Sequence, residues 1–318
     1  MSNLQMTYGA IEEFRQAIIS RNIAAPQSII ADGQYHRFNT NGKHSDKAGW
    51  YVLDLSGNPY GAFGCWRSGA THYWTPNYSD LIGPAERELY RKRHVQSERK
   101  RREAQRIQWA TNAENNKKLL SQAKAPGAEV RSYLAARGLG SWNIPGCIRQ
   151  HPGLVYWHED ENGELQNLGT YPVMLAPVIN DGVVVSLHRT YLSNGNKAPV
   201  PQPKKLTSAS GRLTGGCIPL AERFSGDLGV AEGIETAAAA TLGSGLPVVA
   251  AYSASAMAAY KWPPHTRRLI IFADNDQAGR NAALSLAERA KHFGVDHKIM
   301  TPERPGYDWA DVWQEGQQ

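Results

Sequence analysis

The last hundred residues alternate between apolar runs and helix-forming runs, and this rhythm constrains the fold more than any other feature of the chain. The segment DLGVAEGIETAAAATLG consists of an apolar run followed by an alanine-rich run. The same pattern returns in LPVVAAYSASAMAAYKW and in RRLIIFADNDQAGRNAALSLAERAKHF, and a last apolar run follows in DHKIMTP. Repeated strand and helix units predict a parallel sheet with helices on its faces. We therefore expect an α/β domain over residues 220–318.

Acidic side chains follow two strands of this expected sheet. Glu232 comes directly after the first strand, and Asp274 and Asp276 come after the third, separated by one Asn. Functional groups in parallel sheets collect beyond the carboxyl ends of the strands, so these residues should share one rim, which Asp308 and Asp311 of GYDWADVW can join. Anions this close repel one another unless a cation or hydrogen bonds offset the charge. Alternatively, Asp276 caps the next helix, but this leaves Asp274 and Glu232 unexplained.

The remaining composition limits both the location of the protein and the kind of metal. The 318 residues are 41% hydrophobic, enough for real cores, but contain no apolar run of 18 residues and no secretory leader, so we expect a cytoplasmic protein without membrane contact. Cys65, Cys147 and Cys217 show no paired spacing, which argues against disulfides and against zinc. A metal here would take oxygen ligands. No GxxxxGK[ST] loop occurs, so ATP-driven unwinding is not expected of this chain.

Changes in composition divide the chain into four expected parts: residues 1–82, 83–125, 126–219 and 220–318. The first begins with an amphipathic segment and continues in glycine-punctuated aromatic runs, which predict a small α+β module with an antiparallel sheet. The third has a short helix closed by Gly138 and then strand-like runs, which predict a mixed α+β subdomain.

Residues 83–125 carry most of the positive charge. Between Arg87 and Lys124 there are twelve lysines and arginines against four glutamates, a surplus of +8 in a chain whose net charge is +6. The segment is rich in helix formers and poor in apolar residues, so it predicts a long exposed helix, either a solvated connector or an arm that binds phosphates. Candidate DNA contacts in it are Arg91, Lys92, Arg93, Arg99, Lys100, Arg101 and Arg102.

The N-terminal module mixes aromatic and basic residues. Trp50 and Trp66 stand near Arg37 and Arg67, a combination that can stack on bases and clamp the backbone of single-stranded nucleic acid. Core packing explains such aromatic residues equally well.

The acidic motifs resemble those of a known family. Glu232 in AEGIET, with Asp274 and Asp276 in FADNDQAGR, is similar to the Glu and Asp-x-Asp of the TOPRIM domain shared by bacterial-type primases, topoisomerases and some nucleases. Upstream, PKKLTSASGRLTGG and LHRTYL resemble segments that precede TOPRIM in these primases, and the combination most resembles primase-like proteins of plasmids, phages and integrative elements. A cysteine-rich zinc module and a helicase-docking domain are not apparent, so template selection and helicase coupling would depend on other elements.

This resemblance implies a DNA primase that makes short RNA primers from ribonucleoside triphosphates on a single-stranded DNA template, with a separate helicase or single-strand-binding protein as a further partner. Two ions, Mg²⁺ or Mn²⁺, would be held by Asp274, Asp276, Asp308 and, more weakly, Asp311, while Glu232 is a ligand or a base. Phosphates or template would contact Arg189, Lys204, Lys205 and Arg280, although Arg280 can instead pair with a surface Glu.

Two other functions use the same acidic residues. A TOPRIM nuclease would hydrolyse a strand, and a non-catalytic accessory protein would only bind single-stranded DNA. A topoisomerase needs a strand-passage domain for which this chain has little room.

Overall fold

A computed structural model describes residues 3–40, 46–56, 59–66, 69–75, 84–160, 163–221 and 226–317. The chain forms two compact units, one of residues 1–104 with 160–164 and one of residues 105–159 with 165–318. None of the described helices combines the length and apolar character needed to cross a membrane.

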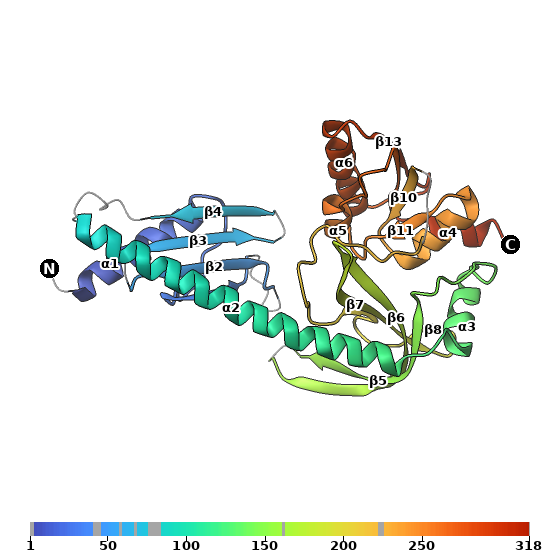
Figure 1. The fold of residues 1–318 in the computed structure, drawn as a ribbon, viewed down its shortest axis with the longest axis horizontal. Coiled ribbons are helices and arrows are strands. Elements are labelled where there is room, and N and C mark those ends of the chain that lie inside the picture. The colour runs from blue at the N-terminus through green and yellow to red at the C-terminus, as the bar shows by residue number, and fades with distance from the viewer. Residues whose placement is uncertain are drawn as a thin grey trace. The chain divides into compact units, whose positions relative to one another are not determined.

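The N-terminal unit is a four-stranded antiparallel sheet with a helix on one face (Figure 1). Its elements follow the strand order along the chain: α1 (Asn3–Ile19), β1 (Asp32–Phe38), β2 (Gly49–Asp54), β3 (Tyr60–Cys65) and β4 (Ala70–Trp74). Phe14 and Ile18 of α1 are fully buried against Tyr51, Leu53 and Phe63 of the sheet. Successive side chains of a strand point to opposite faces, so this core uses only one face of the sheet. The expected small α+β module is confirmed.

The long basic helix is α2 (Pro84–Gln122), whose bounds agree closely with the expected ones. Its second half belongs to the second unit, where Asn112 and Asn116 donate side-chain hydrogen bonds to the carbonyls of Ala209 and Ser208 at 2.7 and 3.4 Å. These buried amides anchor a helix that has few apolar residues of its own.

The first half of the second unit is a mixed α+β region. Its elements are α3 (Ala128–Ala136), β5 (Arg149–Glu159), β6 (Leu165–Asn180), β7 (Val183–Ser193), β8 (Asn196–Lys197) and β9 (Lys204–Leu206). The strands form one antiparallel sheet in the order β5-β6-β7-β8, with β9 also paired to β7. Helix α3 ends as expected, because Gly138 adopts a φ of +73°, a left-handed conformation that glycine tolerates best.

The last hundred residues form the expected parallel sheet, with strand order β11-β10-β12-β13. The elements are β10 (Asp227–Ala231), α4 (Ile234–Ser244), β11 (Val248–Ala250), α5 (Ala254–Ala259), β12 (Arg268–Phe272), α6 (Gln277–His292), β13 (Asp296–Met300) and α7 (Trp309–Glu315). Helices α4 and α6 cover opposite faces of the sheet (Figure 1). Because both faces are covered, the strands are apolar throughout rather than alternating.

One hydrophobic core joins the two halves of this unit. Val130 and Leu134 of α3 lie in the same buried cluster as Met174 of β6, Ile234 of α4 and Ile270 of β12. Residues 126–219 and 220–318, which the sequence predicts as separate parts, therefore pack on each other. This shared core fixes the position of side chains from β9 and α3 relative to the parallel sheet.

Candidate metal centre

The acidic residues that follow β10 and β12 lie at one rim because these strands are parallel neighbours. Ala231 pairs with Phe272, so Glu232 and Asp274 leave the sheet at nearly the same level. Gly279 allows this arrangement, because a Cβ at that position would lie 2.6 Å from the carbonyl oxygen of Asp274. Glycine in the DNDQAG stretch thus lets helix α6 begin close to the end of β12.

Negative charge at this rim is only partly balanced. Burial raises the pKa of Asp274 to about 7, and the charges of Glu232, Asp308 and Asp276 add to the increase, while Lys204 opposes it. Burial and the charge of Asp276 also raise the pKa of Glu232, against hydrogen bonding from the Ala254 backbone. We call Glu232, Asp274, Asp276 and Asp308 the carboxylate rim. Its mutual repulsion is the physical signature of a site that favours a cation.

The donor set of the rim fits a hard divalent ion. Asp274 Oδ1 is buried and has no hydrogen-bond partner, so the structure leaves one carboxylate oxygen uncompensated. Within the described ranges, no group of three or more acidic, histidine or cysteine side chains is arranged to hold a metal ion by itself. Mg²⁺ commonly uses one or two carboxylates together with several waters, and the oxygen-rich rim suits that mode of binding.

Asp276 and Asp308 each also cap a helix. Asp276 Oδ1 accepts a hydrogen bond from the Gly279 amide at 2.7 Å, and Asp308 Oδ1 accepts from Ala310 and Asp311 at 2.7 and 2.9 Å. The expectation that Asp276 caps the following helix is therefore confirmed. Capping engages one oxygen of each carboxylate, and it does not account for the buried Asp274 Oδ1, which has no hydrogen-bond partner.

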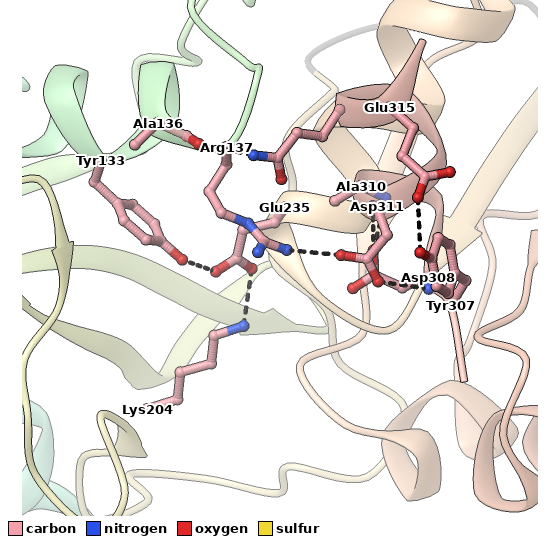
Figure 2. Close-up of polar contacts among 11 residues, drawn as sticks. Tyr133, Ala136, Arg137, Lys204, Glu235, Tyr307, Asp308, Ala310, Asp311 and Glu315 are labelled. Atoms are coloured by element: carbon pink, nitrogen blue, oxygen red, sulfur yellow. Dashed lines mark hydrogen bonds and ion pairs between the residues drawn. The ribbon is translucent and has the colours of Figure 1, made fainter. Parts of the chain in front are cut away.

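Asp311 is committed to local contacts. Its Oδ2 accepts from the Asp308 amide at 3.1 Å, which completes a capping box, and its Oδ1 lies 3.5 Å from the Arg137 guanidinium (Figure 2). Because both oxygens have partners, Asp308 is a better candidate ligand than Asp311.

A buried network brings a positive charge to the rim. Glu235, in the first turn of α4, accepts hydrogen bonds from the Tyr133 hydroxyl and from Lys204 Nζ, the latter at 2.9 Å (Figure 2). Burial alone would raise the pKa of Glu235, but the charges of Lys204 and Lys197 and these two hydrogen bonds outweigh it and hold the pKa well below its usual range. Glu235 is therefore a buried anion that fixes the Lys204 ammonium.

Lys204 can still reach solvent and the acidic residues. Its side chain is 36% exposed, whereas that of Glu235 is 4% exposed, and its charge lowers the pKa of both Glu232 and Asp274. Nearby, burial and then the Lys204 charge lower the pKa of His188 to about 4, which leaves this histidine neutral at physiological pH. Lys204 thus places a positive charge beside the carboxylate rim, and neutral His188 adds no charge.

Comparisons with known proteins agree with this description. Residues 227–318 match the Toprim domain, and residues 110–220 match a domain of unknown function, DUF7146. The C-terminal part of this chain is a Toprim domain. The resemblance noted from the EGIET and DND motifs is therefore confirmed, whereas a search of curated proteins found no match.

Solved primase structures are similar at low identity. A DNA primase domain from Pseudomonas aeruginosa is 16% identical with a TM-score of 0.36, and the match covers 52% of this chain and 53% of that one. A DnaG primase catalytic domain bound to single-stranded DNA is 17% identical with a TM-score of 0.46, covering 67% and 78%. The Aquifex aeolicus primase is 15% identical with a TM-score of 0.41, covering 96% and 82%. All three TM-scores lie below 0.5.

Asn275, between the two aspartates of the Toprim domain, organises the loop that leads to Asp308. Its Nδ2 donates to the Pro302 carbonyl at 2.8 Å, and its backbone bonds to Tyr307 and Gly306 at 2.9 and 2.8 Å. Its Oδ1 accepts from Arg280 at 2.6 Å, so this exposed arginine contacts Asn275 rather than a surface Glu. Arg280 supports the loop and remains only a proposed phosphate contact.

Arg189 and Lys205 lie on the other face of the antiparallel sheet from Lys204. Lys205, which pairs with Arg189 across β7 and β9, donates to the Trp157 carbonyl at 2.7 Å and lies 4.0 Å from the Tyr156 ring centroid. Arg189 donates to the Leu206 carbonyl at 2.7 Å. Neighbouring residues of a strand alternate in direction, so Arg189 and Lys205 do not lie on the same face as Lys204, which is near the Toprim rim.

The predicted DNA contacts before residue 105 fall in the N-terminal unit. Among them, Arg37, Lys92, Arg99, Lys100 and Arg102 are exposed, and Arg101 is half-buried. Arg67 and the side chains of Arg91 and Arg93 lie outside the described residues. Their roles remain predictions.

Several site residues were not found by sequence reasoning. Tyr133, Arg137, His188 and Asn275 come from segments whose patterns indicate only helix, strand or loop. For Glu235 the sequence leaves two interpretations open, facing the site or stabilising the start of a helix. Its place as a single acidic residue in the apolar run GIETAAAA is the signal for burial, because a buried carboxylate needs a partner.

The raised pKa of Asp274 predicts a pH dependence of stability. An acid whose pKa is higher in the folded state than its ordinary value near 4 favours folding when protonated, so this contribution is lost as pH rises from about 4 to about 7. In EDTA, the Asp274→Asn variant should therefore gain stability relative to wild type as pH rises through this window. Thermal melts of both proteins between pH 4 and 8 measure the difference in melting temperature between the variant and wild type. A difference that stays constant with pH would contradict the raised pKa of Asp274.

Proposed function

We propose that this chain is a DNA primase that copies single-stranded DNA into short RNA primers, with Mg²⁺ or Mn²⁺ at the carboxylate rim. The observation that carries the proposal is the juxtaposition of unbalanced carboxylates with the Lys204 ammonium, which buried Glu235 holds in place. Carboxylates attract divalent cations and an ammonium attracts phosphate oxygens. A metal-bound triphosphate offers a divalent cation to the carboxylates and phosphate oxygens to the ammonium. It therefore suits this site better than a substrate with one phosphate.

In primer extension, the 3′-hydroxyl oxygen forms a bond to the α-phosphorus of the incoming ribonucleotide, and the bond to pyrophosphate breaks. Two divalent ions at such a rim would lower the charge on the triphosphate and stabilise the leaving group. Asp274, Asp276 and Asp308 are the residues proposed to hold them. Lys204 would contact a non-bridging phosphate oxygen and orient the triphosphate.

The proton of the 3′-hydroxyl needs an acceptor. Glu232 is proposed for this role because it lies on the rim and its raised pKa makes it a stronger base than an ordinary carboxylate. Burial of Glu232 is the main cause of that increase, and Asp276 adds to it.

A single assay tests this proposal against its competitors. The full-length protein is incubated with single-stranded DNA, labelled ribonucleotides and Mg²⁺ or Mn²⁺, and both template and products are resolved on a denaturing gel. We expect labelled products of primer length and an intact template. Shortened template would instead identify a Toprim nuclease. An intact template without labelled products would identify a non-catalytic DNA-binding protein.

A further inference from the structure

The N-terminal sheet carries a group of aromatic side chains on the face that α1 does not cover. Tyr35 of β1 and Trp50 of β2 stack with ring centroids 5.4 Å apart and planes inclined by 15°. Trp66, just after β3, lies 6.4 Å from Trp50 and donates from Nε1 to the Tyr35 hydroxyl at 3.0 Å. Tyr73 of β4 alternates onto the same face. We call these four residues the aromatic face.

Three of the four rings are exposed although they are large and mostly apolar, and Trp50 is half-buried. Trp66 is 63% exposed, Tyr35 is 49% exposed and Tyr73 is 84% exposed. The fold of the unit does not depend on them, since its core is built from Phe14, Tyr51, Phe63 and their neighbours on the opposite face. A contiguous group of exposed aromatic residues on a soluble domain indicates a binding surface.

The backbone of β3 makes this surface flat. Trp50 pairs with Gly64, and a Cβ at Gly64 would lie 2.9 Å from the Trp50 indole, so the ring lies against bare backbone. The next residue of β3 on this face is Ala62, paired with Val52 and Tyr73. Small residues between the rings leave room for planar groups to lie on the sheet.

One exposed cation, Arg37, lies on the same face as these rings. Arg37 is exposed, pairs with Trp50 across β1 and β2, and is held by a 2.7 Å hydrogen bond from Nε to the Lys47 carbonyl. Because Arg37 and Trp50 are paired across the two strands, their side chains lie on the same face of the sheet. In the same unit, Lys92, Arg99 and Lys100 of α2 are exposed. The ligand should therefore combine planar rings with negative charge.

We propose that the aromatic face binds single-stranded DNA by stacking on its bases, with Arg37 contacting the phosphate backbone. A single strand can turn its bases toward a protein, whereas a duplex keeps them stacked on one another. The site lies in a part of the chain that neither matched domain covers. It would capture the strand independently of the carboxylate rim.

Binding of a fluorescein-labelled oligo(dT) strand to the full-length protein, followed by anisotropy in EDTA without nucleotides, tests the proposal separately from catalysis. Trp66→Ala should weaken binding about tenfold, because stacking on one base contributes energy of that order. Trp66→Phe, which keeps a ring, should restore most of the affinity. Phe293→Ala is the matched control, since it removes a 67% exposed ring from the Toprim domain and should change nothing.

Salt dependence separates stacking from charge. Trp66→Ala should leave the slope of log affinity against log salt unchanged, whereas Arg37→Ala should reduce its magnitude by about 0.7 if it neutralises one phosphate. If Trp66→Ala lowers the melting temperature, Tyr73→Ala replaces it, because that ring is almost free of packing. Unchanged oligo(dT) affinity in a stably folded variant would overturn the proposal. Equal or tighter binding of oligo(U) or duplex, or no binding of oligo(dT) by the wild-type protein, would overturn it as well.

Discussion

Replacing Asp274 or Asp276 with Asn should abolish primer synthesis while the protein stays folded. Each substitution removes a proposed ligand, and since the loss of groups that merely support metal ligands costs about 10–100-fold, we expect a decrease of at least about a hundredfold. Removing one charge also relieves repulsion within the rim, so the melting temperature in EDTA should hold or rise, most for Asp274, whose Oδ1 has no partner. Primer yield and thermal melts measure both effects.

Asp296→Asn is the matched control for these variants. Asp296 is an exposed carboxylate at the start of β13, at the opposite end of the same parallel sheet, so its loss changes the net charge equally. It should leave primer yield unchanged. Synthesis within a few-fold of wild type in both Asp274→Asn and Asp276→Asn would show that the rim does not hold the catalytic ions.

Replacing Lys204 with Met should damage both stability and activity. The substitution leaves the Glu235 carboxylate buried without its ion pair, and breaking such a pair costs about 3 kcal/mol, at the low end of the usual range because Tyr133 and Lys197 remain nearby. It also removes the cation proposed to orient the triphosphate, so the nucleotide KM should rise at least about tenfold. Denaturant unfolding and primer-extension kinetics measure the two effects.

The double variant Lys204→Met with Glu235→Gln distinguishes the two roles of Lys204. Neutralising Glu235 removes the unpaired buried charge, so stability should return toward wild type while the high nucleotide KM persists. Lys205→Met is the control, because it removes the adjacent lysine on the other face of β9 and has no buried carboxylate partner. Recovery of KM together with stability in the double variant would make Lys204 a purely structural residue.

The main features of the fold followed from local patterns. Strand and helix units after residue 226, the long helix α2 and the small antiparallel sheet were all predicted, because hydrophobic periodicity and turn residues act within short windows. The same reasoning placed Glu232 and Asp274 on one rim, since parallel strands end at the same edge of a sheet. It did not reveal that residues 126–219 and the Toprim domain share a core, because that packing depends on long-range shape complementarity.

By itself, the sequence determined which carboxylates follow which strands, and hence that a cation-binding rim of a Toprim domain was to be expected. Tertiary structure alone decided which basic residue lies near that rim. Lys204 and Lys205 are indistinguishable in the run PKKL, yet the pairing of β9 with β7 directs Lys204 toward buried Glu235 and directs Lys205 toward Tyr156. The physical reason is that a strand reverses side-chain direction at every residue, so one step along the chain separates the lysine beside the carboxylate rim from the one on the opposite face of the sheet.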